Sequence, residues 1–195
     1  MSRYKYRRVH GWTAVALLVI SLLITLGQQH GWFSSVTQLQ PGTYSIDHFV
    51  DGDTIAVNMA GKTEDVRFIG VDTPETHKPN TPVECYGPEA AAYTKAEIGI
   101  GPVRLVSDSL STDRDRYGRL LRYVYLPDGK LLEDQLIRNG YGFYYPYFPF
   151  TKSSQFAADE KQAQTHKLGL WAHCHPTPTD QGGYKMNQTE PKTNQ

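Results

Sequence analysis

Residues 45–75 decide the fold of this 195-residue chain, and they read SIDHFVDGDTIAVNMAGKTEDVRFIGVDTPE. Three runs within this stretch are rich in β-branched and other strand-forming residues: Ser45–Val50, Thr54–Met59 and Thr63–Val71. They are separated by Asp51-Gly52 and by Ala60-Gly61-Lys62, which are typical of tight turns. The stretch therefore predicts a three-stranded meander.

The sequence after the meander adds two strands and three helices. The strands are expected at Val103–Ser107 and Leu120–Tyr125. The helices are expected from Gly87-Pro88 to just before Gly99, at Leu131–Asn139 and at Ser153–Lys167. Five strands with a helix inserted after the third predict an α+β fold, namely a five-stranded OB-fold β-barrel with three α-helices.

An N-terminal hydrophobic helix is expected to precede this domain. Four basic residues within positions 1–10 carry a charge of +4, and the run Gly11–Gln28 that follows contains no charge. Such a pattern favours an uncleaved signal anchor, with a cleaved signal peptide as the alternative. We expect residues 1–28 to be this segment, 29–43 a linker, 44–175 the folded domain and 176–195 a disordered polar tail. Under either reading the domain is extracytoplasmic.

The charge balance excludes a chain that is basic throughout. The formal net charge is zero, and after the first ten residues 16 Lys and Arg face 20 Asp and Glu, a net of −4. Proteins that bind nucleic acid without a specific site are usually basic over a whole face. Any affinity for nucleic acid should therefore come from a local site and its metal.

Cys85 and Cys174 are the two cysteines of the chain. An even count in an exported protein favours a disulfide, which would tie the segment before the first helix to the end of the last. Two unrelated buried thiols are the alternative. The run His173-Cys174-His175 suggests a zinc site only weakly, because three adjacent ligands rarely complete a tetrahedral site.

A cluster of acidic residues at the ends of the first strands points to chemistry. Asp53 and Asp72 offer hard oxygen ligands for a cation such as Ca²⁺. Glu75 lies close enough in sequence to act on a metal-bound water, and Arg67 could hold a phosphate with its planar donors. Read alone, each acidic motif could also be an ordinary turn that bonds its own backbone.

Arg119 follows Tyr117-Gly118 at the start of a later strand. By itself it reads as a solvated surface arginine. Two arginines that face one metal site would instead stabilise the charge that develops on a phosphate under attack. Tyr117 could stack on a base or donate to a phosphate.

Taken together, these motifs resemble the staphylococcal nuclease (thermonuclease) family. The resemblance covers roughly residues 44–172 and rests on five motifs in the order and with spacing similar to the family's: Asp51–Thr54, Val66–Glu75, Tyr86–Ala90, Thr112–Arg119 and Gly169–Trp171. It implies an OB-fold barrel with three helices. It also implies a Ca²⁺-dependent nuclease that cleaves DNA and RNA and leaves 3′-phosphate ends.

The resemblance assigns a role to each matching residue. It implies that Ca²⁺ is held by Asp53, Asp72 and the Thr73 carbonyl. It makes Glu75 the group that positions or deprotonates water, and Arg67 and Arg119 the pair that binds the scissile phosphate. It gives Tyr117 a nucleotide contact and places Asp51 beside the metal site as support.

One segment departs from the family pattern. The aromatic stretch Tyr141–Phe150 does not align with the family's substrate wall, so none of Tyr145, Tyr147 and Phe148 is assigned. The expected partners are DNA and RNA, single-stranded by preference, and a membrane through residues 12–28, with the protein a monomer. A catalytically silent nucleic-acid-binding module of the same fold is the alternative function.

Overall fold

The computed structural model describes residues 21, 42–76 and 82–186. The chain separates into two compact units, Met1–Gln40 and Pro41–Gln195, and the fold below is that of the second. The basic segment, the apolar run apart from Ser21, and residues 29–41 of the expected linker lie outside the described residues. No helix within the described ranges is long and apolar enough to cross a membrane.

A six-stranded sheet forms the centre of the second unit. Its strands are β1 (Gly42–Tyr44), β2 (Ile46–Asp51), β3 (Thr54–Met59), β4 (Lys62–Phe68), β6 (Val103–Val106) and β7 (Leu120–Tyr125). Their order across the sheet is β1-β6-β7-β4-β3-β2, and only β4 and β7 run parallel. The expected meander of β2, β3 and β4 is confirmed. Ala60 and Gly61 join β3 to β4 with positive φ angles of 52° and 85°, as a type I′ turn requires.

The prediction of a closed five-stranded barrel is not confirmed in this form. Among the described residues the strand pairings give one sheet of six strands with β1 and β2 at its two ends, and they include no pair that closes it into a barrel. Residues 42 and 43 were expected in the linker, but β1 pairs with β6 from Gly42 to Tyr44. Only Ser45 separates the two edge strands. One continuous segment thus bends at Ser45 and contributes to both edges, a division that strand composition does not reveal.

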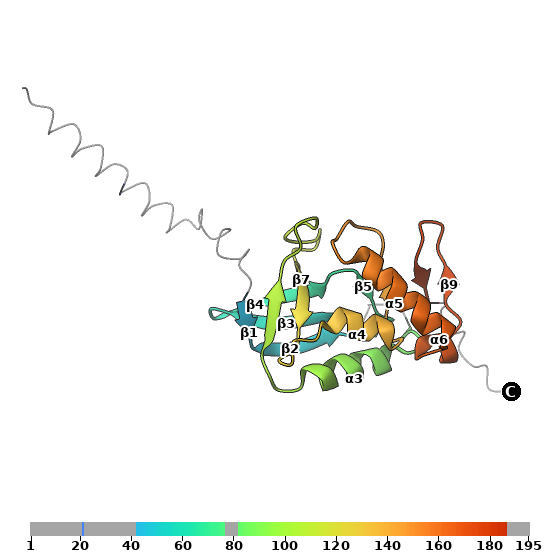
Figure 1. The fold of residues 1–195 in the computed structure, drawn as a ribbon. Coiled ribbons are helices and arrows are strands. Elements are labelled where there is room, and N and C mark those ends of the chain that lie inside the picture. The colour runs from blue at the N-terminus through green and yellow to red at the C-terminus, as the bar shows by residue number, and fades with distance from the viewer. Residues whose placement is uncertain (1–20, 22–41, 77–81, 187–195) are drawn as a thin grey trace, which may run out of the picture. The chain divides into compact units, whose positions relative to one another are not determined.

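Four helices occur among the described residues. They are α3 (Gly87–Ile98), α4 (Leu132–Arg138), α5 (Ser153–Thr165) and the single turn α6 (Leu170–His173), which the sequence did not predict. Figure 1 shows α3 below the strands, with α4 between α3 and α5. The main core combines residues of the sheet, α4 and α5, including Ile55, Phe68, Leu120, Leu136 and Phe156.

Two small sheets bring distant segments together. Strand β5 (Val71–Asp72) pairs with β8 (Phe143–Tyr144), so Asp72 lies beside the start of the aromatic stretch. Strands β9 (Thr177–Pro178) and β10 (Tyr184–Lys185) form a hairpin. This hairpin lies in the segment 176–195 that we expected to be disordered. Its aromatic and apolar residues pack in a second cluster, which explains why the polar composition was misleading.

Candidate active site

The turn from Asp51 to Asp53 joins β2 to β3 and is fixed from two sides. The Thr94 hydroxyl on α3 donates to the Gly52 carbonyl at 2.5 Å. On the other side, a Cβ at Gly52 would lie only 2.7 Å from the Thr73 Oγ1 atom. Glycine is therefore required for the turn to approach Thr73 so closely. This contact places the turn directly against the end of β5.

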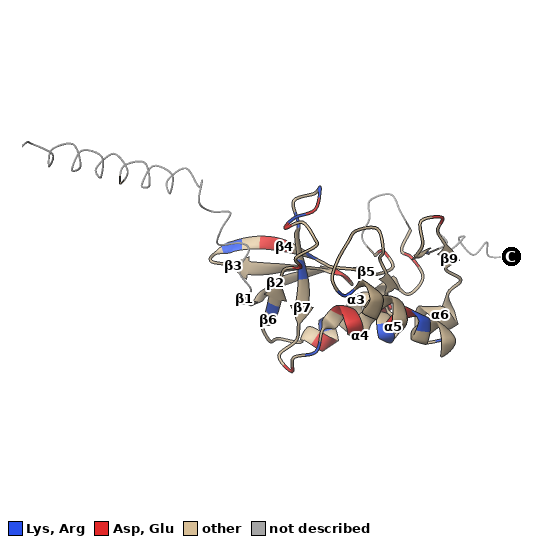
Figure 2. Ribbon diagram, turned by 45° about the horizontal axis from the view of Figure 1, so that its top comes forward, with Lys and Arg blue, Asp and Glu red and all other residues tan. Residues whose placement is uncertain are grey.

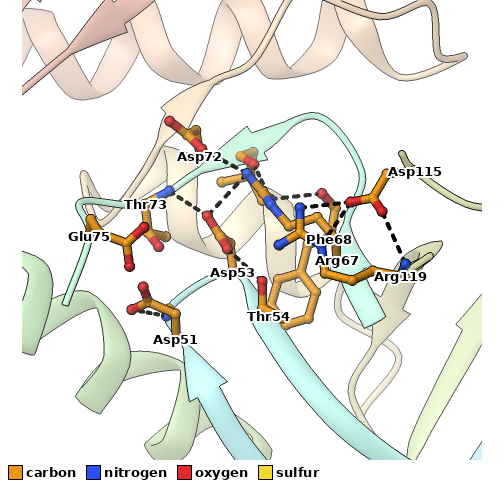
Figure 3. A network of polar contacts seen from close by, with 12 residues as sticks. Asp51, Asp53, Thr54, Arg67, Phe68, Asp72, Thr73, Glu75, Asp115 and Arg119 are labelled. Atoms are coloured by element: carbon orange, nitrogen blue, oxygen red, sulfur yellow. Dashed lines mark hydrogen bonds and ion pairs between the residues drawn. The ribbon is translucent and has the colours of Figure 1, made fainter. Parts of the chain in front are cut away.

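Asp53 and Asp72 converge on one guanidinium group, as Figure 3 shows. The Arg67 Nη2 atom lies 3.2 Å from Asp53 Oδ2 and 2.7 Å from Asp72 Oδ1. Asp53 Oδ2 also accepts the backbone N–H of Thr73 at 2.8 Å, and Asp53 Oδ1 accepts the Thr54 hydroxyl at 2.9 Å. The two aspartates expected as cation ligands are therefore brought together with Arg67 between them.

Arg67 is held on its other side by backbone carbonyls. Its Nη1 atom donates to Val71 O at 2.6 Å and to Phe68 O at 3.1 Å. Burial lowers the pKa of Arg67, but Asp53 and Asp72 outweigh it and the net shift is upward. The guanidinium is thus a fixed positive charge at the point where β4 leads into β5.

The carboxylates of the cluster together carry more negative charge than the Arg67 guanidinium can compensate. The pKa of Asp72 is raised to about 6: burial is the largest cause, Arg67 opposes it, and Asp53, Glu84 and Glu75 add smaller upward contributions. The pKa of Asp51 is also raised, first by burial and then by a hydrogen bond with Glu75. Clustered carboxylates of this kind resist ionisation unless a cation compensates them.

Glu75 begins the loop after β5, and its backbone is clamped by Glu84. The Glu75 N–H donates to Glu84 Oε2 at 2.9 Å, and the Glu84 N–H donates to the Glu75 carbonyl at 2.9 Å. Figure 3 shows the Glu75 carboxylate pointing toward Asp51 and Asp53. Glu84 could not be identified from sequence, because its contact with Glu75 is set by the folding of the loop.

Asp51 supports the site through hydrogen bonds to its neighbours. Its Oδ1 atom accepts the Gly52 N–H and the Thr76 hydroxyl, both at 2.8 Å. Its Oδ2 atom accepts the Thr76 N–H at 3.3 Å. Asp51 therefore ties the β2–β3 turn to the residue that follows Glu75, in keeping with a supporting role.

Arg119 is oriented by Asp115, a residue that the sequence analysis did not single out. Its Nε and Nη2 atoms each lie 2.7 Å from Asp115 Oδ2. Asp115 Oδ1 accepts the N–H groups of Tyr117 and Arg119 at 2.9 and 3.0 Å. Burial alone would raise the pKa of Asp115, but the hydrogen bonds from Arg119 and Tyr117 lower it. The spacing of four residues between Asp115 and Arg119 was the available signal.

Tyr117 is exposed and lies between two arginines. The Arg119 and Arg116 guanidinium carbons lie 5.5 and 4.8 Å from its ring centroid. Arg116 also donates to the Tyr117 hydroxyl at 2.7 Å. An exposed ring with cations on it suits a contact with a base or a phosphate.

The donor set of the cluster suits a hard cation. Carboxylate and carbonyl oxygens are the ligands that Ca²⁺ and Mg²⁺ prefer. In the described part of the chain, no three His, Cys, Asp or Glu side chains converge as a metal-binding group. A cation held by Asp53 and Asp72 would therefore need the Thr73 carbonyl and water to complete its shell, which Ca²⁺ accepts with its six to eight oxygen ligands.

The two cysteines form a disulfide. Cys85 and Cys174 are joined with an S–S distance of 2.06 Å across 89 residues of sequence. The alternative of two unrelated thiols is wrong. Cys174 is consequently not available as a thiolate, which removes the zinc reading of His173-Cys174-His175.

Comparison with known proteins gives consistent matches. The sequence matches the family described as staphylococcal nuclease homologue over residues 65–173. It is 39% identical over 169 residues to a thermonuclease of Staphylococcus hyicus, an alignment that covers 84% of this chain and 96% of that protein. It is 41% identical over 147 residues to endonuclease YncB of Bacillus subtilis (strain 168), covering 74% and 69%. A thermonuclease of Staphylococcus intermedius is 37% identical over 166 residues, covering 82% and 96%.

Proposed function

The chain belongs to the staphylococcal nuclease family, and from that premise we propose that it is a Ca²⁺-dependent nuclease that hydrolyses phosphodiester bonds of DNA and RNA. The observation that carries the proposal is the convergence of Asp53, Asp72 and Arg67 in one contact network. Glu75 stands at the end of the same segment. Acidic ligands, a further carboxylate and a phosphate clamp are the parts that this chemistry requires.

Asp53, Asp72 and the Thr73 carbonyl would hold the cation. When bound, Ca²⁺ supplies a positive charge that polarises the phosphate and compensates the carboxylates. The contacts of Asp53 and Asp72 with the same Arg67 guanidinium support this assignment, because two clustered carboxylates carry more negative charge than one guanidinium compensates.

The remaining groups bind the phosphate and move a proton. Arg67 and Arg119 donate to the phosphate oxygens and stabilise the charge that grows there during attack. Glu75 accepts a proton from the attacking water, and the clamp by Glu84 fixes the backbone from which its side chain extends. Asp115 keeps the Arg119 guanidinium oriented before substrate arrives. In the proposal the P–O bond to the 5′ oxygen breaks, which leaves a 3′-phosphate end.

The charge distribution supports a local site. Figure 2 shows acidic and basic positions together on β4. Three arginines beside the site, Arg114, Arg116 and Arg122, could have formed a basic patch. Instead Arg114 pairs with Glu64 at 2.8 Å, and the buried Arg122 pairs with Asp113 at 2.6 Å. Arg116 instead contacts Tyr117, so attraction of a nucleic acid is concentrated at Arg67, Arg119, Arg116 and the bound cation.

The proposal includes action outside the cytoplasm by a monomer with a preference for single strands. The Cys85–Cys174 disulfide supports an oxidising compartment. The basic segment before the apolar run Gly11–Gln28 supports an N-terminal anchor through residues 12–28, with cleavage and secretion as the alternative. Intact mass of the native protein distinguishes the two.

The test is cleavage of single-stranded DNA and RNA by the protein with millimolar Ca²⁺ or with a chelator. We expect cleavage only with Ca²⁺, and a loss of about 10²–10⁴-fold in kcat for Glu75→Gln, the size typical of a lost general base. Glu89→Gln is the matched control, because Glu89 is an exposed residue in the first turn of α3. Wild-type protein that binds DNA with Ca²⁺ but forms no product would instead favour the silent binding module.

A further inference from the structure

A cleft of about 570 Å³ lies between the aromatic stretch and the β9–β10 hairpin. Its walls differ in chemistry. One wall is aromatic and the other polar, and the lining residues are Tyr145, Tyr147, Phe148, Thr179, Asp180 and Gln181. The sequence analysis left the aromatic stretch without a role, and it predicted no structure for the hairpin segment.

The aromatic wall adjoins the phosphate clamp. The Tyr145 N–H donates to the Gly70 carbonyl at 2.9 Å, one residue before β5 begins. The Arg67 guanidinium carbon lies 5.9 Å from the Tyr145 ring centroid. A phosphate on Arg67 therefore has the edge of the cleft beside it. If a substrate phosphate binds Arg67, the nucleoside attached to that phosphate is positioned to enter the cleft.

The polar wall is held in place by several contacts. The hydroxyls of Thr179 and Tyr147 are 2.5 Å apart and bridge the two walls. At the base of the hairpin, the Tyr184 ring lies 4.8 Å from the Trp171 ring, centroid to centroid. Met186 is buried in the same cluster. The hairpin is thus built into the domain beside the cleft.

We propose that the β9–β10 hairpin forms the second wall of a nucleobase subsite and that Asp180 selects the base. The inference rests on the proposed nuclease function and adds a specificity to it. The rings of Tyr145 and Phe148 offer a stacking surface that every base can use. Asp180, at the turn of the hairpin, lines the cleft with a carboxylate whose two oxygens accept hydrogen bonds.

An acceptor at this position distinguishes bases by their Watson–Crick edges. Guanine presents N1–H and N2–H donors side by side, which match the two oxygens of a carboxylate. Thymine and uracil present a single N–H between two carbonyl oxygens, and those oxygens face the carboxylate unfavourably. The subsite therefore favours guanine over thymine or uracil. The base edge must be unpaired to make this contact, which agrees with a preference for single strands.

The first experiment maps cleavage of a mixed-sequence single-stranded DNA by sequencing the product ends. For wild type we expect guanine to be enriched over thymine at one position next to the cut. Asp180→Asn should reduce that enrichment by about fivefold or more, the size of one charge-assisted hydrogen bond. Asp128→Asn, an exposed aspartate in the turn after β7, is the matched control and should leave the profile unchanged. An unchanged profile in Asp180→Asn would overturn the inference.

The second experiment separates this inference from the proposed nuclease activity. Binding of dGMP and dTMP is measured by calorimetry with Ca²⁺ present. We expect tighter binding of dGMP, and loss of that difference in Asp180→Asn. Equal binding of both nucleotides by wild type overturns the subsite even if the protein cleaves DNA. Absence of cleavage with a retained dGMP preference overturns the nuclease and leaves the subsite supported.

A third variant tests the bridge between the walls. Tyr147→Phe keeps the ring but removes the hydroxyl that contacts Thr179. We expect KM to rise about threefold to tenfold with kcat unchanged, since the hairpin binds substrate and takes no part in the chemistry. A fall in kcat with KM unchanged would place the hairpin outside substrate binding and contradict the proposal.

Discussion

Replacing each active-site arginine by methionine should show that Arg67 contributes to both stability and catalysis, whereas Arg119 contributes mainly to catalysis. Arg67→Met and Arg119→Met remove the same group and keep most of the side-chain volume. Both should lower kcat by about 10²–10³-fold, because each removes a preorganised donor to the phosphate. Their effects on folding should differ, because the two guanidinium groups sit in different surroundings.

The contacts set the expected free energies of unfolding. The Arg67 side chain is 12% exposed and that of Asp53 10%, and Arg67 also binds two backbone carbonyls. Breaking a buried pair from one side costs about 3–5 kcal/mol. Asp72 is 42% exposed, which moves the expectation to the lower end, about 3 kcal/mol. Arg119 is 30% exposed and has one carboxylate partner, so its loss should cost about 1 kcal/mol or less.

The measurement is urea unfolding followed by far-UV circular dichroism, with activity measured on the same preparations. A chelator is needed in the unfolding experiment, because a cation on Asp53 and Asp72 would replace the lost charge. The reasoning fails if Arg67→Met unfolds within about 1 kcal/mol of wild type. It also fails if Arg119→Met loses as much stability as Arg67→Met.

Three further predictions follow from the rest of the domain. Burial raises the pKa of Glu160 to about 7, so the fold favours its protonated form and that stabilisation is lost as pH rises from about 4.5 to above 7. Glu160→Gln should therefore raise Tm at pH 8 relative to wild type and have little effect at pH 4, which thermal unfolding at the two pH values checks. The double variant Cys85→Ser and Cys174→Ser should lose about 2–4 kcal/mol in urea unfolding, and an unchanged midpoint would contradict the stabilising role of the bond. Asp115→Asn should lower kcat less than Arg119→Ala does, since it leaves the guanidinium in place but loosely oriented; steady-state kinetics of both variants test the order.

The parts of the site that could be predicted from sequence are those set by local structure. The turn at Asp51-Gly52 and the end of β5 are fixed by turn residues next to strand-forming runs, so Asp53 and Asp72 could be placed at neighbouring strand ends. Their positions agree with that expectation, since Arg67 contacts both aspartates.

The parts that could not be predicted depend on contacts between distant segments. The segment 42–44 is only three residues long, and it is a strand only because it pairs with β6. Nothing in the sequence marks Arg122 as buried, yet it is 1% exposed and pairs with Asp113. A charged residue is buried when a partner across the fold compensates it, and composition does not identify that partner.

The disulfide links the two segments on which the proposed general base and the proposed base subsite depend. Cys85 directly follows Glu84, which clamps the backbone of Glu75. Cys174 lies directly after α6 and shortly before the β9–β10 hairpin that lines the proposed base subsite. One covalent bond therefore ties the loop of the proposed general base to the wall proposed to select the base. Removing it should loosen both regions at once, so that kcat and base preference change together, whereas Asp180→Asn should change the preference alone.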